Sequence, residues 1–448
     1  MWHNSLRKNR ARRVLWHAHY CAWAQLCILW VSLFATTSNA SEVAQDWRPV
    51  PVVVEQTPEG WQLLRGGQPY YVKGAGGDVY KLDLLRSLGA NSIRTWGVGD
   101  GRVLEEAAAR GMTVLVCLDI ASERFGFDYD DEDAVVAQLE QARAAVRRFK
   151  NHPALLGWMI GNELNLMHTN PKVWDAVNDI SKMIHEEDGL HPTTTALAGL
   201  DESTYALIQA RAPDLDFLST QVYGMLTVLA EHVASIGIEM PMMVTEWGTV
   251  GHWELPQTTW GAPIELTSTE KSEHYMKGYR TSIEPFADQV IGSYVFLWGQ
   301  KQERTPTWYG MFTPRGEVTE PVDAVEKLWR GQWPEDRSPF IEGLFLDDQI
   351  AHENVVLESG QLYDVVLEAG DHEGDALSYE WVVMEESRAT EIGGDREIIP
   401  AVMPGLVAAP RAETQLRAPQ KPGAYRLFGY VRDPQGKVAH ANLPFKVE

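Results

Sequence analysis

Two glutamates, Glu163 and Glu246, each stand at the end of an apolar run that predicts a buried β-strand. A carboxylate at the mouth of a buried strand costs free energy unless it is paired or used. Because the carboxyl ends of parallel strands meet at one edge of a sheet, two such strands suggest a single paired site. Two carboxyls of this kind can cleave a glycosidic bond with retention: one protonates the leaving oxygen and the other attacks the anomeric carbon.

The elements that must hold this pair alternate between short apolar runs and longer helical stretches from about residue 70 onward. Strands are expected at 71–74, 92–96, 113–118, 156–161, 193–198, 217–222, 242–246 and 291–296, and helices at 81–88, 102–110, 133–150, 172–186, 269–284 and 322–329. Eight such units predict an α/β fold, a closed (β/α)₈ TIM barrel, whose active site lies at the carboxyl ends of the strands. Glu163 would end the fourth strand and Glu246 the seventh.

An open, doubly wound sheet is the alternative architecture. It usually carries a glycine-rich phosphate loop after its first strand, and the nearest candidate is the segment GAGG at 74–77. This segment lacks the G-x-G-x-x-G spacing and the acidic residue downstream. We therefore interpret it as a tight turn.

The regions on either side of the barrel, 70–332, have a different character. Residues 1–40 combine a basic start, a short apolar core and the small-residue end SNA, which is typical of a cleaved signal peptide and predicts a secreted or periplasmic protein. Residues 41–69 predict a β-hairpin that plugs the barrel floor, and 340–448 predict an all-β sandwich of the immunoglobulin or polycystic-kidney-disease (PKD) kind. An acidic turn at 371–375 is interpreted as a solvated hairpin tip rather than a calcium site.

The 448 residues carry a formal net charge of −23, which becomes more negative if the five basic residues in 1–40 are removed. Such a surface repels phosphate backbones and anionic headgroups, so nucleic acid and membranes are poor partners and a neutral carbohydrate fits better. No His, Asp and Glu cluster has catalytic metal spacing, and neither a metal nor a cofactor is predicted. Cys117, within an apolar run, is expected to be a buried thiol.

The two glutamate segments, HPALLGWMIGNE at 152–163 and VTEWG at 244–248, resemble the signatures of clan A retaining glycoside hydrolases. The resemblance is closest to the barrel domain of the family that includes β-galactosidases and β-glucuronidases. It implies that Glu163 is the acid/base and Glu246 the nucleophile. It covers residues 70–330, and it departs from the family in having a hairpin where sandwich domains precede the barrel.

Further residues acquire implied substrate-binding or supporting roles from the same resemblance. Arg94 would support the nucleophile, Asn162 would bind the sugar 2-hydroxyl, and Tyr223 would donate to the nucleophile. Trp298 would floor the first subsite, and Trp96 and Trp247 are predicted to bind substrate. Aromatic residues of the loops, which can stack on sugar rings, are Trp253, Trp260, Trp308 and Tyr309.

The leading hypothesis is an exported retaining β-glycoside hydrolase that cleaves a neutral, glucan-like oligo- or polysaccharide by double displacement. A glucan transglycosylase with the same catalytic pair shares the first half-reaction and is an alternative. A non-catalytic carbohydrate-binding barrel is a second alternative. The sugar, the linkage, exo or endo action, the role of the C-terminal domain and the oligomeric state are not indicated by the sequence.

Overall fold

The computed structural model describes residues 47–390 and 395–448. The expected signal peptide and the first residues of the hairpin segment lie outside the described residues. Within the described part of the chain, no helix has the length and apolar character needed to cross a membrane.

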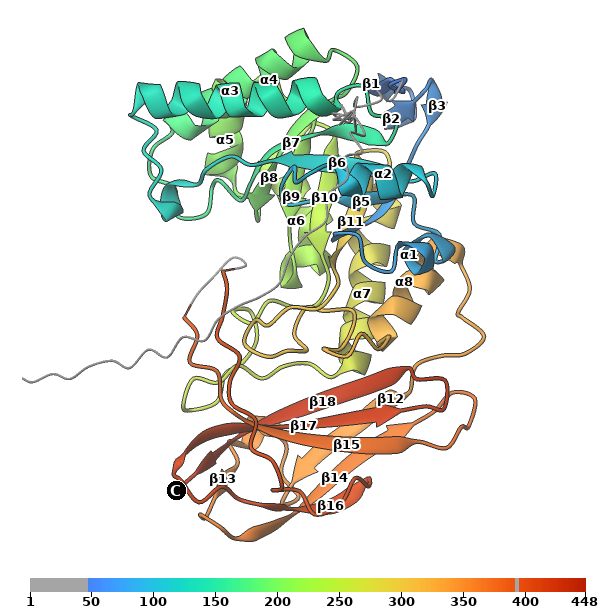
Figure 1. Ribbon diagram of the computed structural model, residues 1–448, viewed down its shortest axis with the longest axis vertical. Helices are drawn as coiled ribbons and strands as arrows, with labels where there is room; N and C mark the ends of the chain where they lie inside the picture. Colours follow the sequence, from blue (N-terminus) through green and yellow to red (C-terminus); the bar gives the residue numbers. More distant parts are fainter. Residues whose placement is uncertain (1–46, 391–394) are drawn as a thin grey trace, which may run out of the picture. The chain divides into compact units, whose positions relative to one another are not determined.

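Eight parallel strands form a closed barrel in which each strand pairs with the next along the chain, and the last pairs with the first. Figure 1 shows these strands with helices packed outside them. The strands are β4 (Val72–Gly77), β5 (Ser92–Arg94), β6 (Thr113–Leu118), β7 (Leu155–Asn162), β8 (Thr193–Ala198), β9 (Leu218–Gln221), β10 (Met242–Trp247) and β11 (Val290–Trp298). The predicted TIM barrel is confirmed; Glu163 directly follows its fourth strand, and Glu246 lies in its seventh.

The outer helices are α1 (Leu82–Ser87), α2 (Arg102–Ala108), α3 (Glu132–Phe149), α4 (Lys172–Glu187), α5 (Glu202–Arg211), α6 (Leu229–Ile236), α7 (Ser268–Ser282) and α8 (Glu320–Arg330). Helix α7 begins with a capping box, in which the Thr267 side chain accepts from the Glu270 backbone and the Glu270 side chain accepts from Thr267. Helices α5 and α6 were not among the predicted helices.

The floor of the barrel is covered by a small antiparallel sheet of β1 (Val52–Thr57), β2 (Gly60–Arg65) and β3 (Gln68–Pro69). Val52 and Leu63 from this sheet are buried in one cluster with inward-facing barrel residues such as Met159 and Met243. The buried thiol of Cys117 belongs to the same cluster. This packing closes one end of the barrel, and the strand ends that carry Glu163 and Glu246 lie at the other end.

The glycines at 74–77 are part of a strand, and the prediction of a tight turn there is wrong. They lie in β4, where a Cβ on Gly74 would stand 2.3 Å from the Tyr294 ring and one on Gly76 would stand 2.9 Å from the Trp96 ring. The missing side chains therefore make room for aromatic neighbours.

The C-terminal residues form two facing sheets. One contains β12 (Phe340–Leu346), β14 (Leu362–Gly370) and β16 (Glu413–Arg417), and the other contains β13 (Val356–Leu357), β15 (Ser378–Glu385), β17 (Gly423–Arg432) and β18 (Val438–Val447). A separate hydrophobic core lies between them. The expected β-sandwich is confirmed.

The acidic turn of the sandwich is built around Asp371, whose carboxylate accepts hydrogen bonds from the backbone nitrogens of Glu373 and Asp375. Across residues 47–390 and 395–448, no group of three or more His, Cys, Asp or Glu side chains could hold a metal ion.

Candidate active site

Glu246 is held by hydrogen-bond donors on both of its carboxylate oxygens. Oε1 accepts from Nε1 of Trp96 at 2.9 Å and from the guanidinium of Arg94, and Oε2 accepts from the hydroxyl of Tyr223 at 2.6 Å. The glutamate is 4% exposed. These three donors, one of them a buried cation, hold the carboxylate in one orientation, as a positioned nucleophile requires.

Local backbone irregularities direct both glutamates toward the barrel mouth. The pairing of β10 with β9 shifts in register just before Glu246, and such bulges re-aim side chains. Glu163, directly after β7, has a φ of 51°, in the left-handed region that non-glycine residues rarely adopt. The preceding Gly161 has a φ of 74°, and a Cβ there would lie 2.6 Å from the side chain of Leu164. Strained positions of this kind cluster at functional sites.

The carboxyl of Glu163 lies in an environment that favours its protonated form. Burial first, and the negative charge of Glu246 second, raise the pKa of Glu163 to about 7. Arg94 opposes this shift because its positive charge stabilises the carboxylate. One carboxyl of the pair is thus disposed to carry a proton near neutral pH, while the other accepts three hydrogen bonds, one of them from a buried cation. An acid/base and a nucleophile require two such different environments.

Asn162 lies beside this pair with its amide orientation fixed. Its Oδ1 accepts hydrogen bonds from the guanidinium of Arg94 and, at 2.7 Å, from Nε2 of Gln221. Because the oxygen is occupied by two donors, the Nδ2 group is available to donate toward a ligand. Arg94 is completely buried and connects Asn162 to Glu246 through its two terminal nitrogens.

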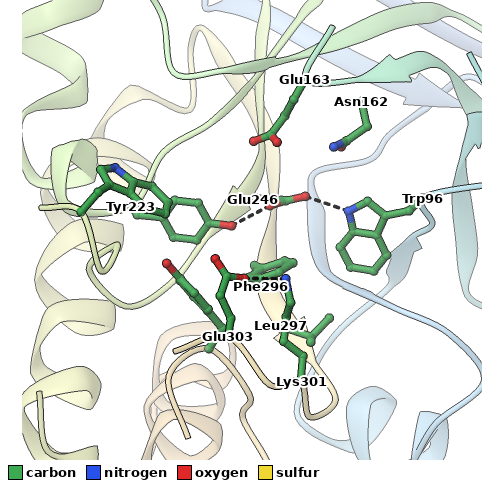
Figure 2. A pocket seen from close by; sticks show the side chains of 11 residues that line it. Trp96, Asn162, Glu163, Tyr223, Glu246, Phe296, Leu297, Lys301 and Glu303 are labelled. Carbon is green, nitrogen blue, oxygen red and sulfur yellow. Dashed lines mark hydrogen bonds and ion pairs between the residues drawn. The ribbon is translucent and has the colours of Figure 1, made fainter. Parts of the chain in front are cut away.

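These residues surround a cavity of about 330 Å³. Figure 2 shows Glu246 between Trp96 and Tyr223, with Glu163 on one side of it and the pair Lys301 and Glu303 on the other. The described residues that line the cavity are Trp96, Asn162, Glu163, Tyr223, Glu246, Trp253, Phe296, Leu297, Lys301, Glu303 and Tyr309. Polar groups at the base and aromatic walls suit a pyranose ring, which has a polar rim and apolar faces.

Two tryptophans that were predicted to bind substrate do not line this cavity. Trp247 is fully buried against Tyr275 and Tyr279, in the layer between strands and helices, because side chains alternate along β10 and its neighbour Glu246 points inward. Trp298 belongs to the same layer and donates its Nε1 to the backbone oxygen of Tyr80 at 2.8 Å. Its placement does not support the expected role as subsite floor.

Phe296 lines the cavity instead, with its ring 5.6 Å from that of Trp96 and 5.8 Å from that of Tyr223. It follows the inward-facing Tyr294 by two residues, so alternation along the strand could have indicated it. The register of β11 becomes irregular between Val295 and Trp298, which breaks the alternation at the tryptophan.

The charged pair on the loop after β11 was not predicted as part of the site. Nζ of Lys301 lies 2.6 Å from Oε2 of Glu303, and Oε1 of Glu303 lies 3.4 Å from Nε2 of His252. Of the loop aromatics that the sequence singled out, Trp253 and Tyr309 line the cavity. The sequence analysis named aromatic residues of this loop, but no pattern singled out its charged pair.

Residues 101–252 match the sequence profile described as "Glycosyl hydrolases family 2, TIM barrel domain". The matched segment contains both Glu163 and Glu246. This part of the barrel is similar to the barrel domain of glycosyl hydrolase family 2. The resemblance found in the sequence is thereby confirmed for this segment. No curated protein matches the chain.

Two solved structures are similar to this chain in fold. A β-glucuronidase 2 of Bacteroides uniformis, solved with a covalently bound cyclophellitol-6-carboxylate aziridine, matches with a TM-score of 0.51 and 14% identity over 89% of this chain and 48% of that chain. A β-glucuronidase of Bifidobacterium dentium matches with a TM-score of 0.50 and 18% identity over 62% of this chain and 49% of that chain. The present chain thus spans about half the length of these enzymes.

Proposed function

We propose that the protein is a retaining β-glycoside hydrolase. The proposal rests on the different electrostatic environments of two carboxyls that line one cavity. Glu246 receives donors on both oxygens, including the buried cation of Arg94, whereas the pKa of Glu163 is raised to about 7. The family 2 match over both residues supports the same assignment.

In the proposed mechanism, Glu246 attacks the anomeric carbon while Glu163 transfers its proton to the leaving oxygen, and a covalent glycosyl-enzyme forms. Formation of the ester removes the negative charge of Glu246, which is one of the causes of the raised pKa of Glu163. Glu163 then becomes a stronger acid, is deprotonated, and activates the incoming water as a general base. A second sugar in place of water would give transglycosylation, which product analysis by mass spectrometry at high acceptor concentration would detect.

The assignment of the two glutamates can be tested with their variants. Glu246→Gln is expected to abolish turnover because the amide cannot form the glycosyl ester. Glu163→Ala is expected to lose most activity and to recover part of it with azide, a nucleophile that needs no general base. Labelling of Glu246 by a 2-deoxy-2-fluoroglycoside, located by peptide mass spectrometry, would exclude a barrel that only binds carbohydrate. Full activity in either variant would contradict the proposal.

We further propose that the sugar in the cavity is neutral. The described lining residues include three glutamates and one lysine, and the ammonium of Lys301 is already paired with Glu303 at 2.6 Å. A uronate carboxylate would therefore enter a site of net negative charge without an unpaired cation among those residues, which costs free energy. The two enzymes that the chain resembles in fold are named β-glucuronidases, so the proposed neutral sugar differs from the glucuronide in their names.

The choice between neutral and acidic sugars can be measured with aryl β-glucoside, β-mannoside, β-galactoside and β-glucuronide at equal concentrations. A higher kcat/KM for one of the three neutral glycosides than for the glucuronide is expected. The reverse order would contradict the neutral substrate and leave the hydrolase assignment standing. A screen of β-1,2, β-1,3, β-1,4 and β-1,6 glucans would then test the proposed glucan-like substrate.

Export to the periplasm or the medium is also proposed, on the basis of the leader pattern in residues 1–40. Amino-terminal sequencing of protein that is recovered from a cell envelope fraction would test it. Cleavage near residue 40 is expected, and an intact leader on the accumulated protein would contradict the proposal.

A further inference from the structure

One segment of the C-terminal sandwich, residues 395–399, contacts loops at the mouth of the barrel. The backbone nitrogen of Arg304 donates to Oε2 of Glu397 at 2.7 Å, and Nη1 of Arg304 lies 3.7 Å from Oε1 of the same residue. Nη2 of Arg124 lies 3.5 Å from Oδ1 of Asp395. The segment is thus connected to two barrel loops, one after β6 and one after β11.

A second cavity, of about 720 Å³, lies between this segment and the loop after β11. Its lining includes Lys301, Gln302, Arg396, Glu397, Ile398 and Ile399. Lys301 also lines the catalytic cavity, so the two spaces are neighbours that share a wall residue. A saccharide longer than one ring would extend from the first cavity into such a neighbouring space.

The lining of the second cavity has features that folding alone does not explain. Ile398 is 89% exposed and Ile399 is 66% exposed, although isoleucine is normally among the most buried residues. In the described chain, neither amide atom of Gln302 has a hydrogen-bond partner, and both are covered. Apolar side chains beside polar groups can contact both the faces and the hydroxyls of a sugar.

One end of the segment is joined to the loop that carries Glu163. Arg124 pairs with Asp395, and the carboxylate of the adjacent Glu123 accepts hydrogen bonds from the backbone nitrogens of Thr169 and Asn170, which follow Glu163 in the chain. Because Glu163 protonates the leaving oxygen, the leaving group of the substrate must be on its side of the scissile bond.

We propose that the sandwich segment 395–399 and the loop residues Lys301 and Gln302 form the subsite that binds the leaving-group sugar, and therefore also an acceptor sugar. This inference rests on the proposed glycosidase function. It gives the C-terminal domain a direct part in substrate selection, because the sugar after the scissile bond would contact residues of both domains.

The test follows the two half-reactions separately. An effect on this subsite can then be told apart from an effect on the catalytic glutamates. The protein is first labelled with a dinitrophenyl 2-deoxy-2-fluoroglycoside, whose leaving group needs no proton, using whichever of the glucoside, mannoside and galactoside reacts fastest. Excess label is removed, and recovery of activity is followed in buffer alone and with cellobiose, laminaribiose or gentiobiose as acceptor. Acceptor-dependent recovery reports on the leaving-group subsite, whereas labelling reports on Glu246.

Replacing both exposed isoleucines, in Ile398→Ser/Ile399→Ser, is expected to slow acceptor-dependent recovery by roughly tenfold, the effect of removing apolar contacts in a specificity pocket. Recovery in buffer is expected to stay unchanged, because water needs no sugar subsite, and labelling of Glu246 is expected to go to completion. Gln302→Leu should have the same effect on the acceptor without loss of thermal stability, because it replaces a covered amide that lacks partners. The matched control is Ile350→Ser, which changes a 42% exposed isoleucine elsewhere in the sandwich.

Acceptor-dependent recovery at the parental rate in both altered proteins, with labelling intact, would overturn the subsite. Failure of the unaltered protein to react with any of the three labels would instead overturn the proposed function, and the subsite with it. The two failures are therefore distinguishable.

Discussion

The hydroxyl of Tyr223 lies 2.6 Å from Oε2 of Glu246, and it is the donor to that oxygen. Burial, and then the charge of Glu246, raise the pKa of Tyr223 well above its ordinary value, so the phenol remains a donor throughout the accessible pH range. The position of Glu246 is thus fixed by a neutral donor from the loop after β9 on one oxygen and by Trp96 and Arg94 on the other.

Loss of this hydroxyl is expected to lower activity more than stability. Tyr223→Phe leaves the nucleophile less well oriented and one buried oxygen unpartnered, and removal of one preorganised donor typically lowers kcat by about 100-fold or more. Steady-state kinetics on an aryl glycoside would measure it. The matched control is Tyr279→Phe, in a buried tyrosine outside the cavity. An unchanged kcat in Tyr223→Phe would contradict the role of this hydrogen bond.

Activity is expected to fall as pH rises through about 7. Burial and the charge of Glu246 raise the pKa of Glu163 to about 7, and only the protonated carboxyl can donate to the leaving oxygen. The basic limb of the kcat/KM profile should therefore report this group. In Glu163→Gln, assayed with a dinitrophenyl glycoside that needs no acid, the limb should disappear. A basic limb that persists there near pH 7 would assign the titration to another group.

The raised pKa of Glu163 also makes the stability of the fold depend on pH. A carboxyl whose pKa is higher in the folded protein than its ordinary 4.5 destabilises the fold when it is ionised, so the cost is absent below about pH 4.5 and present above about 7. Glu163→Gln is thus expected to raise the free energy of unfolding at pH 8 and to change it little at pH 4. Urea denaturation at the two pH values would measure the difference.

The barrel could be predicted from the sequence because its signals are local. The apolar run that ends at Glu163 and the one that ends at Glu246 each correspond to a strand, β7 and β10, and the two glutamates meet because parallel strands share an edge. Helix α5 was missed because its amphipathic pattern is weak: only Thr204, Tyr205 and Ile208 of it are buried.

The base of the site was also predictable, whereas its rim was not. Arg94, Asn162 and Tyr223 stand at strand ends, so their order in the sequence fixes their place around the barrel. Lys301 and Glu303 lie in a loop of more than 20 residues between β11 and α8, whose course depends on contacts with the sandwich, such as that between Arg304 and Glu397. Contacts between distant segments leave no periodic pattern in a single sequence.

The amide of Asn162 is expected to act on the sugar 2-hydroxyl, since Arg94 and Gln221 occupy its oxygen and leave its nitrogen to donate. Hydrogen bonds to this hydroxyl strengthen in the transition state and supply several kcal/mol. Asn162→Ala should therefore lower kcat/KM by roughly 100-fold on an aryl glycoside. On the matching 2-deoxy glycoside the loss should be small. Equal losses on both substrates would show that Asn162 acts only by positioning Arg94.

The buried ion pair between Lys271 and Glu265 is expected to stabilise the junction of the barrel with the sandwich. Nζ of Lys271 lies 2.5 Å from Oε1 of Glu265, and Oε2 of Glu265 accepts from Nδ2 of Asn442, in β18, at 2.6 Å, and from the hydroxyl of Thr305. Burial opposes ionisation of Glu265, but the charge of Lys271 and these hydrogen bonds outweigh it and lower the pKa of Glu265 to about 2. The stabilisation is present above the ordinary pKa of 4.5 and is lost as pH falls toward 2.

Removal of one partner leaves a buried charge uncompensated, so Lys271→Met is expected to lower the free energy of unfolding by about 3–5 kcal/mol at pH 7. In Lys271→Met/Glu265→Gln, where no charge remains, much of this loss should be recovered. The matched control is Lys172→Met at the exposed first residue of helix α4, which breaks a surface pair with Asp130 and should change stability little. Denaturant unfolding would measure all three. A double variant no more stable than Lys271→Met would show that Glu265 is needed for its contacts to Asn442 and Thr305 rather than for its charge.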